Sequence, residues 1–183
     1  MKRILFIIAL ATSISASAQE RYFTRGASVS FFADGSNTPE KIEAHNGQGT
    51  SVFDAKTGQF EFAVLMKAFE FEKALMQDHF HENYVESEKY PKSTFKGNVV
   101  DMSKVDLSKD GAYPVKVKGN LTLHGVTKEV LTDAVFTVKG GKVNGASTFK
   151  ILLADYKVEI PNLVKDKISK DVRIVVDANY TKM

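Results

Sequence analysis

The stretch VKGNLTLHGVTK, residues 117–128, decides the fold of this chain. From Val117 to Leu123, apolar and polar side chains alternate with the period of a half-buried β-strand. His124 and Gly125 then form a short turn, in which glycine supplies the positive φ that a tight turn needs. A connection this short favours antiparallel pairing, because a parallel crossover needs about a dozen residues or more. The stretch therefore predicts a β-hairpin.

The same alternation continues along most of the chain. Short turns, such as KTGQ at 56–59 and KGGK at 139–142, separate the alternating segments and favour antiparallel neighbours. We therefore expect about eight or nine strands. The segments with strand character are residues 28–33, 41–45, 51–54, 60–67, 94–101, 113–123, 129–139, 143–153 and 172–180.

Two segments depart from this period. Residues 155–170 contain Pro161 and predict a loop or a short helical turn. Residues 71–83 predict a single amphipathic α-helix inserted between strands, because their apolar side chains recur at helical spacing. Those side chains are Phe71, Leu75, Met76 and Phe80.

Many strands with one apolar face and a single helix leave two architectures, a β-sandwich and a closed barrel. Several of the expected strands are about ten residues long, which is long for a sandwich of this size. A closed barrel also removes the exposed edges that a sheet without disulfides has to protect. The pattern therefore favours the barrel.

The amino terminus is typical of a secretory signal peptide. Lys2 and Arg3 precede the apolar stretch 4–11, and ASA at 16–18 fits the cleavage pattern of small residues. We expect residues 1–18 to be removed, leaving one domain over residues 19–183 in the periplasm or outside the cell. The apolar stretch is far shorter than the roughly 20 residues that span a bilayer, so we expect no stable membrane insertion.

Composition excludes several other classes of protein. The chain has no cysteine, which excludes disulfides and a lipoprotein anchor. Lys2 and Arg3 account for most of the excess of basic over acidic residues, so the expected domain is close to neutral. Nothing in this balance indicates nucleic-acid binding, which needs clustered positive charge.

Two ordered blocks of sequence resemble the YceI-like family. One block combines LMQDHF at 75–80 with EKYPKSTFKG at 88–97, and the other is the hairpin 117–128. The resemblance continues through FKI at 149–151 and DY at 155–156 to the last strand. It implies an exported, lipocalin-like antiparallel barrel of about eight strands with one inserted α-helix near its mouth. It further implies a tunnel for a polyisoprenoid or a similar long apolar chain.

The apolar side chains on one face of each expected strand would point into the barrel. Together with this resemblance they predict the ligand-binding residues. Inward apolar side chains could equally fill a solid barrel, but the small inward residues Gly119, Gly145, Ser147 and Ala178 favour a hollow one. Asp78, His79 and Tyr90 are the candidates for contact with a ligand head group. The predicted ligand-binding residues are Phe60, Phe62, Val64, Met66, Leu75, Met76, His79, Phe80, Tyr90, Phe95, Val117, Leu121, Phe149 and Ile151.

The histidines give no sign of catalytic or metal chemistry. His79 and His81 are two positions apart on the expected helix and face different sides, so they could not easily share an ion. We expect His81 to be solvated and His124 to cap its turn through a ring nitrogen. The chain lacks a Gly-x-Ser-x-Gly elbow and any cysteine nucleophile. We therefore expect neither an enzyme nor a metal site, and no cofactor apart from a bound isoprenoid or acyl lipid.

The sequence thus predicts an exported binding protein. Its ligand would be a polyisoprenoid, an isoprenoid quinone or a fatty-acid-like lipid held inside the barrel. The alternative is an exported stress or interaction protein whose barrel is filled and whose outer surface binds a partner. A large apolar cavity would favour the first, and a solid core beside an exposed apolar patch would favour the second. The sequence leaves the oligomeric state open, with a homodimer as one alternative.

Overall fold

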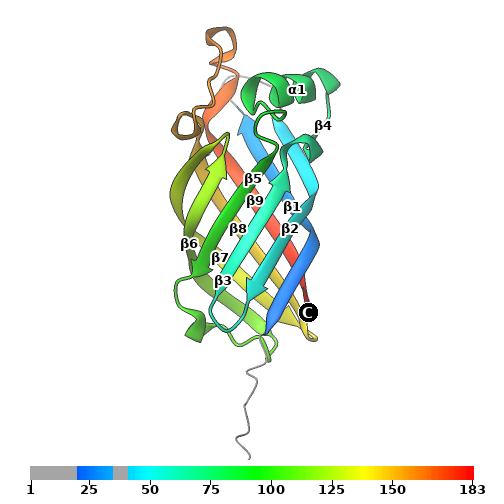
Figure 1. The fold of residues 1–183 in the computed structure, drawn as a ribbon, viewed down its shortest axis with the longest axis vertical. Coiled ribbons are helices and arrows are strands. Elements are labelled where there is room, and N and C mark those ends of the chain that lie inside the picture. Colours follow the sequence, from blue (N-terminus) through cyan, green and yellow to red (C-terminus); the bar gives the residue numbers. More distant parts are fainter. Residues whose placement is uncertain (1–19, 35–40) are drawn as a thin grey trace, which may run out of the picture.

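The structure is a computed structural model that describes residues 20–34 and 41–183. The predicted signal peptide, residues 1–18, lies outside the described residues. The described chain forms an antiparallel barrel whose strands are tilted around the long axis (Figure 1). The strands are β1 (Arg21–Asp34), β2 (Glu43–Asp54), β3 (Gln59–Leu65), β4 (Glu70–Phe71), β5 (Lys92–Val99), β6 (Gly111–Leu123), β7 (Val126–Lys139), β8 (Lys142–Leu152) and β9 (Ile168–Lys182).

The long strands form a closed ring. They pair in the order β1-β9-β8-β7-β6-β5-β3-β2, and β1 also pairs with β2. The two-residue strand β4 pairs with the start of β2, beyond the part of β2 that pairs with β3. Because the ring closes, each long strand of the described chain has a neighbour on both sides. The predicted all-β, lipocalin-like barrel of about eight strands with an inserted helix is therefore confirmed.

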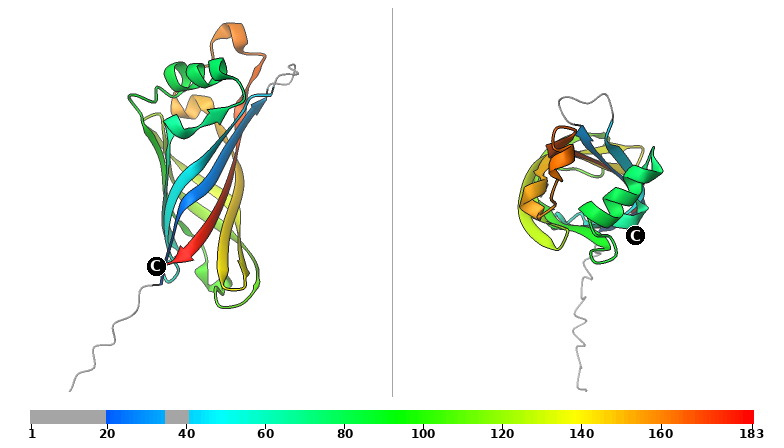
Figure 2. Two further views of the ribbon diagram at one scale, coloured as in Figure 1. Left: turned by 90° about the vertical axis from the view of Figure 1, so that its right-hand side faces the viewer. Right: turned by 90° about the horizontal axis from the view of Figure 1, so that it is seen from above.

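The two ends of the barrel differ. One end, here called the mouth, is covered by short helices (Figure 2). The other end, the base, contains η3 (Met102–Lys104) and both ends of the described chain. The backbone N–H of Met183 donates to the carbonyl oxygen of Arg21 there, at 2.8 Å. The helices at the mouth are η1 (Met66–Ala68), α1 (Ala74–His79), the π-helix η2 (Phe80–Tyr84), η4 (Leu153–Tyr156) and η5 (Asn162–Val164).

The strand β2 was predicted as two separate strands, and this prediction is wrong. The intervening NGQGT at 46–50 is polar and rich in glycine, yet it continues the ladder with β1 across two irregularities of register. The backbone of Asn46 does not pair with β3, but its side chain does contact the end of that strand. The Nδ2 of Asn46 donates to the carbonyl oxygen of Leu65 at 2.9 Å. Position 49 needs a glycine because the backbone of β1 comes close to it. A Cβ there would lie 2.8 Å from the carbonyl oxygen of Ala27.

The inserted helix begins later than predicted. Phe71 belongs to β4, where it pairs with Ala44, and its backbone N–H donates to Oε1 of Gln77 at 3.1 Å. The helix therefore starts at Ala74, and it continues beyond His79 as η2. Residues 155–170 contain the short helical turns that were expected there. None of the helices in the described ranges is long and apolar enough to cross a membrane.

The interior is packed solidly at the base. Phe53 is 0% exposed, and its ring lies 5.0 Å from the ring of Phe136 and 6.0 Å from that of Tyr180. The inward positions of several strands bring these rings together, because alternate side chains of a strand face the same side. We call the buried set the base cluster, and it consists of Tyr22, Phe53, Val99, Val115, Val117, Phe136, Val138 and Val143.

Candidate functional site

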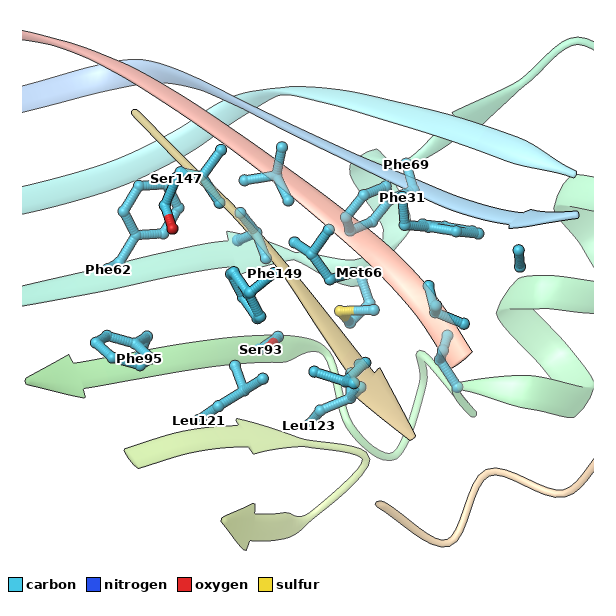
Figure 3. Close-up of a pocket in the computed structure, with 18 of the residues that line it drawn as sticks. Phe31, Phe62, Met66, Phe69, Ser93, Phe95, Leu121, Leu123, Ser147 and Phe149 are labelled. Atoms are coloured by element: carbon cyan, nitrogen blue, oxygen red, sulfur yellow. The ribbon is translucent and has the colours of Figure 1, made fainter. Parts of the chain in front are cut away.

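Above the base cluster the barrel encloses a cavity of about 690 Å³ that reaches the mouth. This volume lies within the roughly 300–1,000 Å³ of ordinary ligand sites. Figure 3 shows Phe62 of β3, Met66 of η1 and Phe149 of β8 pointing into the same space. Phe62 and Phe149 are only half-buried, although they point inward, because part of each ring borders the cavity.

The predicted ligand-binding residues lie on the cavity wall, with the exception of Tyr90. Tyr90 lies in the turn before β5, and its ring packs edge-on against His124 with 4.7 Å between the centroids. It also covers Gly125, where a Cβ would lie 2.5 Å from the tyrosine ring. Tyr90 therefore supports the mouth from outside the cavity, and its contact with a ligand head group stays a prediction.

The candidates for head-group contact are distributed differently from the prediction. His79 is exposed and lines the cavity at the mouth. Asp78, its neighbour on α1, is exposed and does not line it. His81 was expected to be solvated, but it is half-buried beside Phe80, and its Nε2 has no hydrogen-bond partner among the described residues. Of these polar residues on the inserted helix, His79 is the one that lines the cavity.

Of an aromatic group under α1, the sequence predicted only Phe80 as a site residue and missed the other three rings. Phe31 of β1 stacks on Phe80 with 5.1 Å between the centroids, and Phe69 and Phe71 pack against both rings. All four rings line the cavity. The alternation of Val29, Phe31 and Ala33 was a usable signal. Phe69 and Phe71 carried none, because they lie where the chain leaves the strand period.

Aromatic rings also form the floor of the cavity. Phe60 and Phe95 stack with 5.4 Å between their centroids, and both pack on the base cluster. Gly97 and Gly119 face each other beneath Phe95, and a Cβ on either would lie 2.6 Å from its ring. Gly119 was taken as a sign of a hollow barrel, but it makes room for a ring instead. Gly145 of β8 likewise leaves room for aromatic rings, those of Tyr180 and Phe136.

Several hydroxyl groups on the wall are hydrogen-bonded within the protein. Ser93 donates to the carbonyl oxygen of Thr122 at 2.9 Å, and Ser147 donates to that of Asp133 at 2.7 Å. The hydroxyl of Tyr180 bonds Oγ of Ser51 at 2.9 Å. Burial raises the pKa of Tyr180, so this phenol stays neutral. The deep wall is therefore uncharged and suited to an apolar chain.

His124 ties the elements of the mouth together. Its Nε2 lies 2.7 Å from Oε2 of Glu86, and its Nδ1 lies 3.1 Å from the carbonyl oxygen of Tyr156. Both ring nitrogens of His124 are therefore within hydrogen-bond distance of an oxygen from another segment. The hairpin β6–β7 is thereby joined to the segment after η2 and to η4. The predicted turn cap is wrong, although the positive φ of Gly125, +72°, is confirmed.

Comparison with known proteins identifies the fold. The sequence matches the YceI-like domain over residues 24–180. The chain is similar to a polyisoprenoid binding domain from Saccharophagus degradans, implicated in plant cell wall breakdown. The TM-score is 0.77 at 16% identity, covering 90% of this chain and 99% of that one. No curated protein matches the chain.

Two further solved structures have the same fold. BcnA of Burkholderia cenocepacia matches with a TM-score of 0.68 at 16% identity, covering 85% of this chain and 96% of that one. The YCEI protein of Campylobacter jejuni matches with a TM-score of 0.57 at 19% identity, covering 78% and 86% respectively. Since the matched domain spans nearly the whole described chain, this protein belongs to the YceI-like domain family, as its sequence blocks predicted.

Proposed function

We propose that this protein binds a long apolar lipid, such as a polyisoprenoid, an isoprenoid quinone or an acyl chain, inside its barrel. The observation that carries the proposal is the apolar cavity of about 690 Å³ above the base cluster. At about 30 Å³ for a group the size of water, such a space holds on the order of twenty methylene-sized groups. The similar Saccharophagus degradans domain, described as polyisoprenoid binding, supports the same class of ligand.

Burial of the chain would supply the affinity. Each methylene group transferred from water to the wall contributes roughly 0.8 kcal/mol, and the ordering of a flexible chain opposes this gain. Met66 and Met76 line the cavity, and their flexible thioethers adapt to chains of different shape. The mechanism is reversible sequestration without chemical change. The cavity favours this function over the alternative of a filled barrel that acts through its outer surface.

The floor would set the length of chain that fits. Ala134 lines the cavity and also packs against the base cluster, so it lies where the hollow part ends. A larger side chain there would raise the floor. We therefore expect Ala134→Phe to lower the affinity for long prenols by more than tenfold while short prenols still bind. Thr137→Phe, on the exposed side of the same strand, is the matched control.

The test uses the protein purified from its native host. Solvent extraction followed by mass spectrometry should identify a lipid in stoichiometric amount. The lipid-free protein should then take up prenols or fatty acids from solution, and Ala134→Phe should reduce the uptake of long ones. An extract without lipid, together with no uptake of any added chain, would refute the proposal.

Export remains part of the proposal. A carrier for a water-insoluble chain has an evident use in an aqueous compartment beside a membrane. Residues 1–18 supply the three parts of a signal peptide. Expression of the full chain in a bacterium, followed by fractionation and amino-terminal sequencing, should find the protein outside the cytoplasm and starting at Gln19. An uncleaved cytoplasmic product would overturn this part alone.

A further inference from the structure

Two leucine side chains at the mouth are largely exposed to water. Leu163 of η5 is 92% exposed and Leu75 of α1 is 66% exposed, which makes them the two most exposed leucines of the described chain. The loop with η5 stands beyond the rim of the barrel, and α1 lies at the same end (Figure 1, Figure 2). Two segments that are distant in the sequence therefore present leucine to the solvent at one end of the barrel.

These leucines extend the apolar wall of the cavity outward. Leu75 itself lines the cavity, although most of its side chain is exposed. Val164, the residue after Leu163, lines the cavity as well. Leu131, on the outer wall of the barrel, is 60% exposed but does not line it, and single exposed residues of this kind are ordinary. At the mouth, by contrast, apolar surface leads from the solvent into the cavity.

The loop that carries Leu163 is suited to an apolar environment. Residues 160–164 read IPNLV, so four of the five side chains are apolar. The backbone N–H of Val164 donates to the carbonyl oxygen of Pro161 at 3.0 Å, and that of Lys167 donates to the carbonyl oxygen of Val164 at 3.0 Å. Proline has no backbone N–H. These features reduce the number of backbone polar groups that would lose water if the loop entered a lipid layer.

Resting on the proposed lipid-binding function, we propose that the mouth docks reversibly on the surface of a lipid bilayer, with Leu163 and Leu75 inserted at its apolar boundary. A bilayer is the favoured partner, because leucines can enter it and because it is where a water-insoluble chain resides. The ligand would then pass between bilayer and cavity along apolar surface rather than through water. Two leucines supply weak binding, which suits a carrier that leaves the membrane again.

The first test measures the transfer of a bound lipid to vesicles. The protein is loaded with palmitate that carries an anthroyloxy fluorophore, and it is mixed with phosphatidylcholine vesicles that contain a quencher lipid. If transfer requires contact, its rate should rise in proportion to the vesicle concentration. Release into water would instead give a rate that does not depend on the vesicle concentration. Added sodium chloride should leave the rate nearly unchanged, because salt screens charges and the proposed contact is apolar.

Serine variants assign the contact to the exposed leucine of η5. Leu163→Ser should slow transfer roughly three- to tenfold, since a partly inserted leucine contributes part of the free energy of full burial. Because Leu163 does not line the cavity, the affinity for the labelled palmitate should stay at the wild-type value. Leu131→Ser removes a similarly exposed leucine from the outer wall, and it should keep the wild-type rate.

A second test reports insertion directly. The chain contains no tryptophan, so Leu163→Trp introduces a single indole at the tip of the loop. Its emission should shift to shorter wavelength when phosphatidylcholine vesicles are added, because the indole moves from water into a less polar layer. Leu131→Trp is the matched control, and its emission should not shift.

The outcomes separate this inference from the proposed function. A transfer rate independent of vesicle concentration, or equal rates for Leu163→Ser and Leu131→Ser, would overturn docking while lipid binding stands. A rate that falls steeply with salt would overturn the apolar contact. Dimerisation of the lipid-free protein that Leu163→Ser abolishes, measured by sedimentation, would show that a second copy covers these leucines instead. If the protein binds neither the labelled palmitate nor an added prenol, the proposed function itself fails.

Discussion

Phe53 at the base and Phe149 on the cavity wall are both inward-facing phenylalanines of the same ring of strands, but their surroundings differ. Phe53 is 0% exposed and packs on three other aromatic rings. Phe149 is half-buried, because its ring borders empty space. The base is therefore filled, whereas the buried side chains of the upper barrel pack around a cavity. The filled part of the barrel and the cavity thus lie at different ends.

The largest effect is expected from truncation at the base. Phe53→Ala should reduce the free energy of unfolding by about 3–5 kcal/mol, because it opens a void in a filled region. Phe149→Ala should cost roughly 1–2 kcal/mol, since the ring it removes already borders a cavity and only its apolar contacts are lost. Urea unfolding of the lipid-free protein measures both. Equal losses would mean that the upper barrel is as tightly packed as the base.

A smaller effect is expected where the floor meets the wall. Gly119→Ala places a Cβ 2.5 Å from the carbonyl oxygen of Lys96 and 2.6 Å from the ring of Phe95, so β5 and β6 must shift. The variant should lose about 1–3 kcal/mol of stability through overpacking. Gly47→Ala is the control, because nothing lies within 4 Å of a Cβ there. If both substitutions lower the free energy of unfolding equally, the close contact between β5 and β6 at the floor does not contribute to stability.

At the mouth, His124→Asn removes the bonds to Glu86 and Tyr156 but keeps a residue that tolerates the local φ of +50°. We expect a loss of about 1–2 kcal/mol and faster hydrogen exchange around η4, with exchange at the base unchanged. His45→Asn is the control, because His45 is exposed and bonds Ser30 on the surface. Faster exchange at the base would show that the two ends are not independent.

The smallest effect is expected at Asp106, in a loop of the base. Hydrogen bonds from Lys109 and Ser108 lower the pKa of Asp106 from 3.8 to about 2. A lowered pKa means that the charged carboxylate stabilises the fold above pH 3.8, and that this contribution is lost as the pH falls through about 2. Carbon NMR titration of the carboxyl group should give a midpoint near 2. A midpoint near 3.8 would show that these bonds do not persist in solution.

Prediction from the sequence succeeded where one periodicity extended over a whole strand. The strands β6 to β9 were located within a few residues, because their inward rows are apolar along most of their length. The strand β2 was divided in two, because the backbone contacts of Gly49 and Asn46 leave no trace in the periodicity of the sequence. The start of the helix was misplaced because Phe71 fits a helix and a strand equally well in the sequence.

The residues that line the candidate site could be predicted from the sequence, but the presence of a cavity could not. An inward apolar row looks the same whether it fills a barrel or lines a cavity, so the family resemblance decided the matter. The small residues were ambiguous as well, because Gly119 accommodates a ring whereas Ser147 borders the cavity.

The adjacent chain ends at the base have a practical consequence. Because Met183 lies beside Arg21 at the end opposite the mouth, a fusion partner, dye or solid support attached at the carboxyl terminus would be a full barrel length from the opening. A protein immobilised in this way would point its mouth toward the solution. It could therefore report the capture and release of ligands at a sensor surface without obstruction by its own attachment.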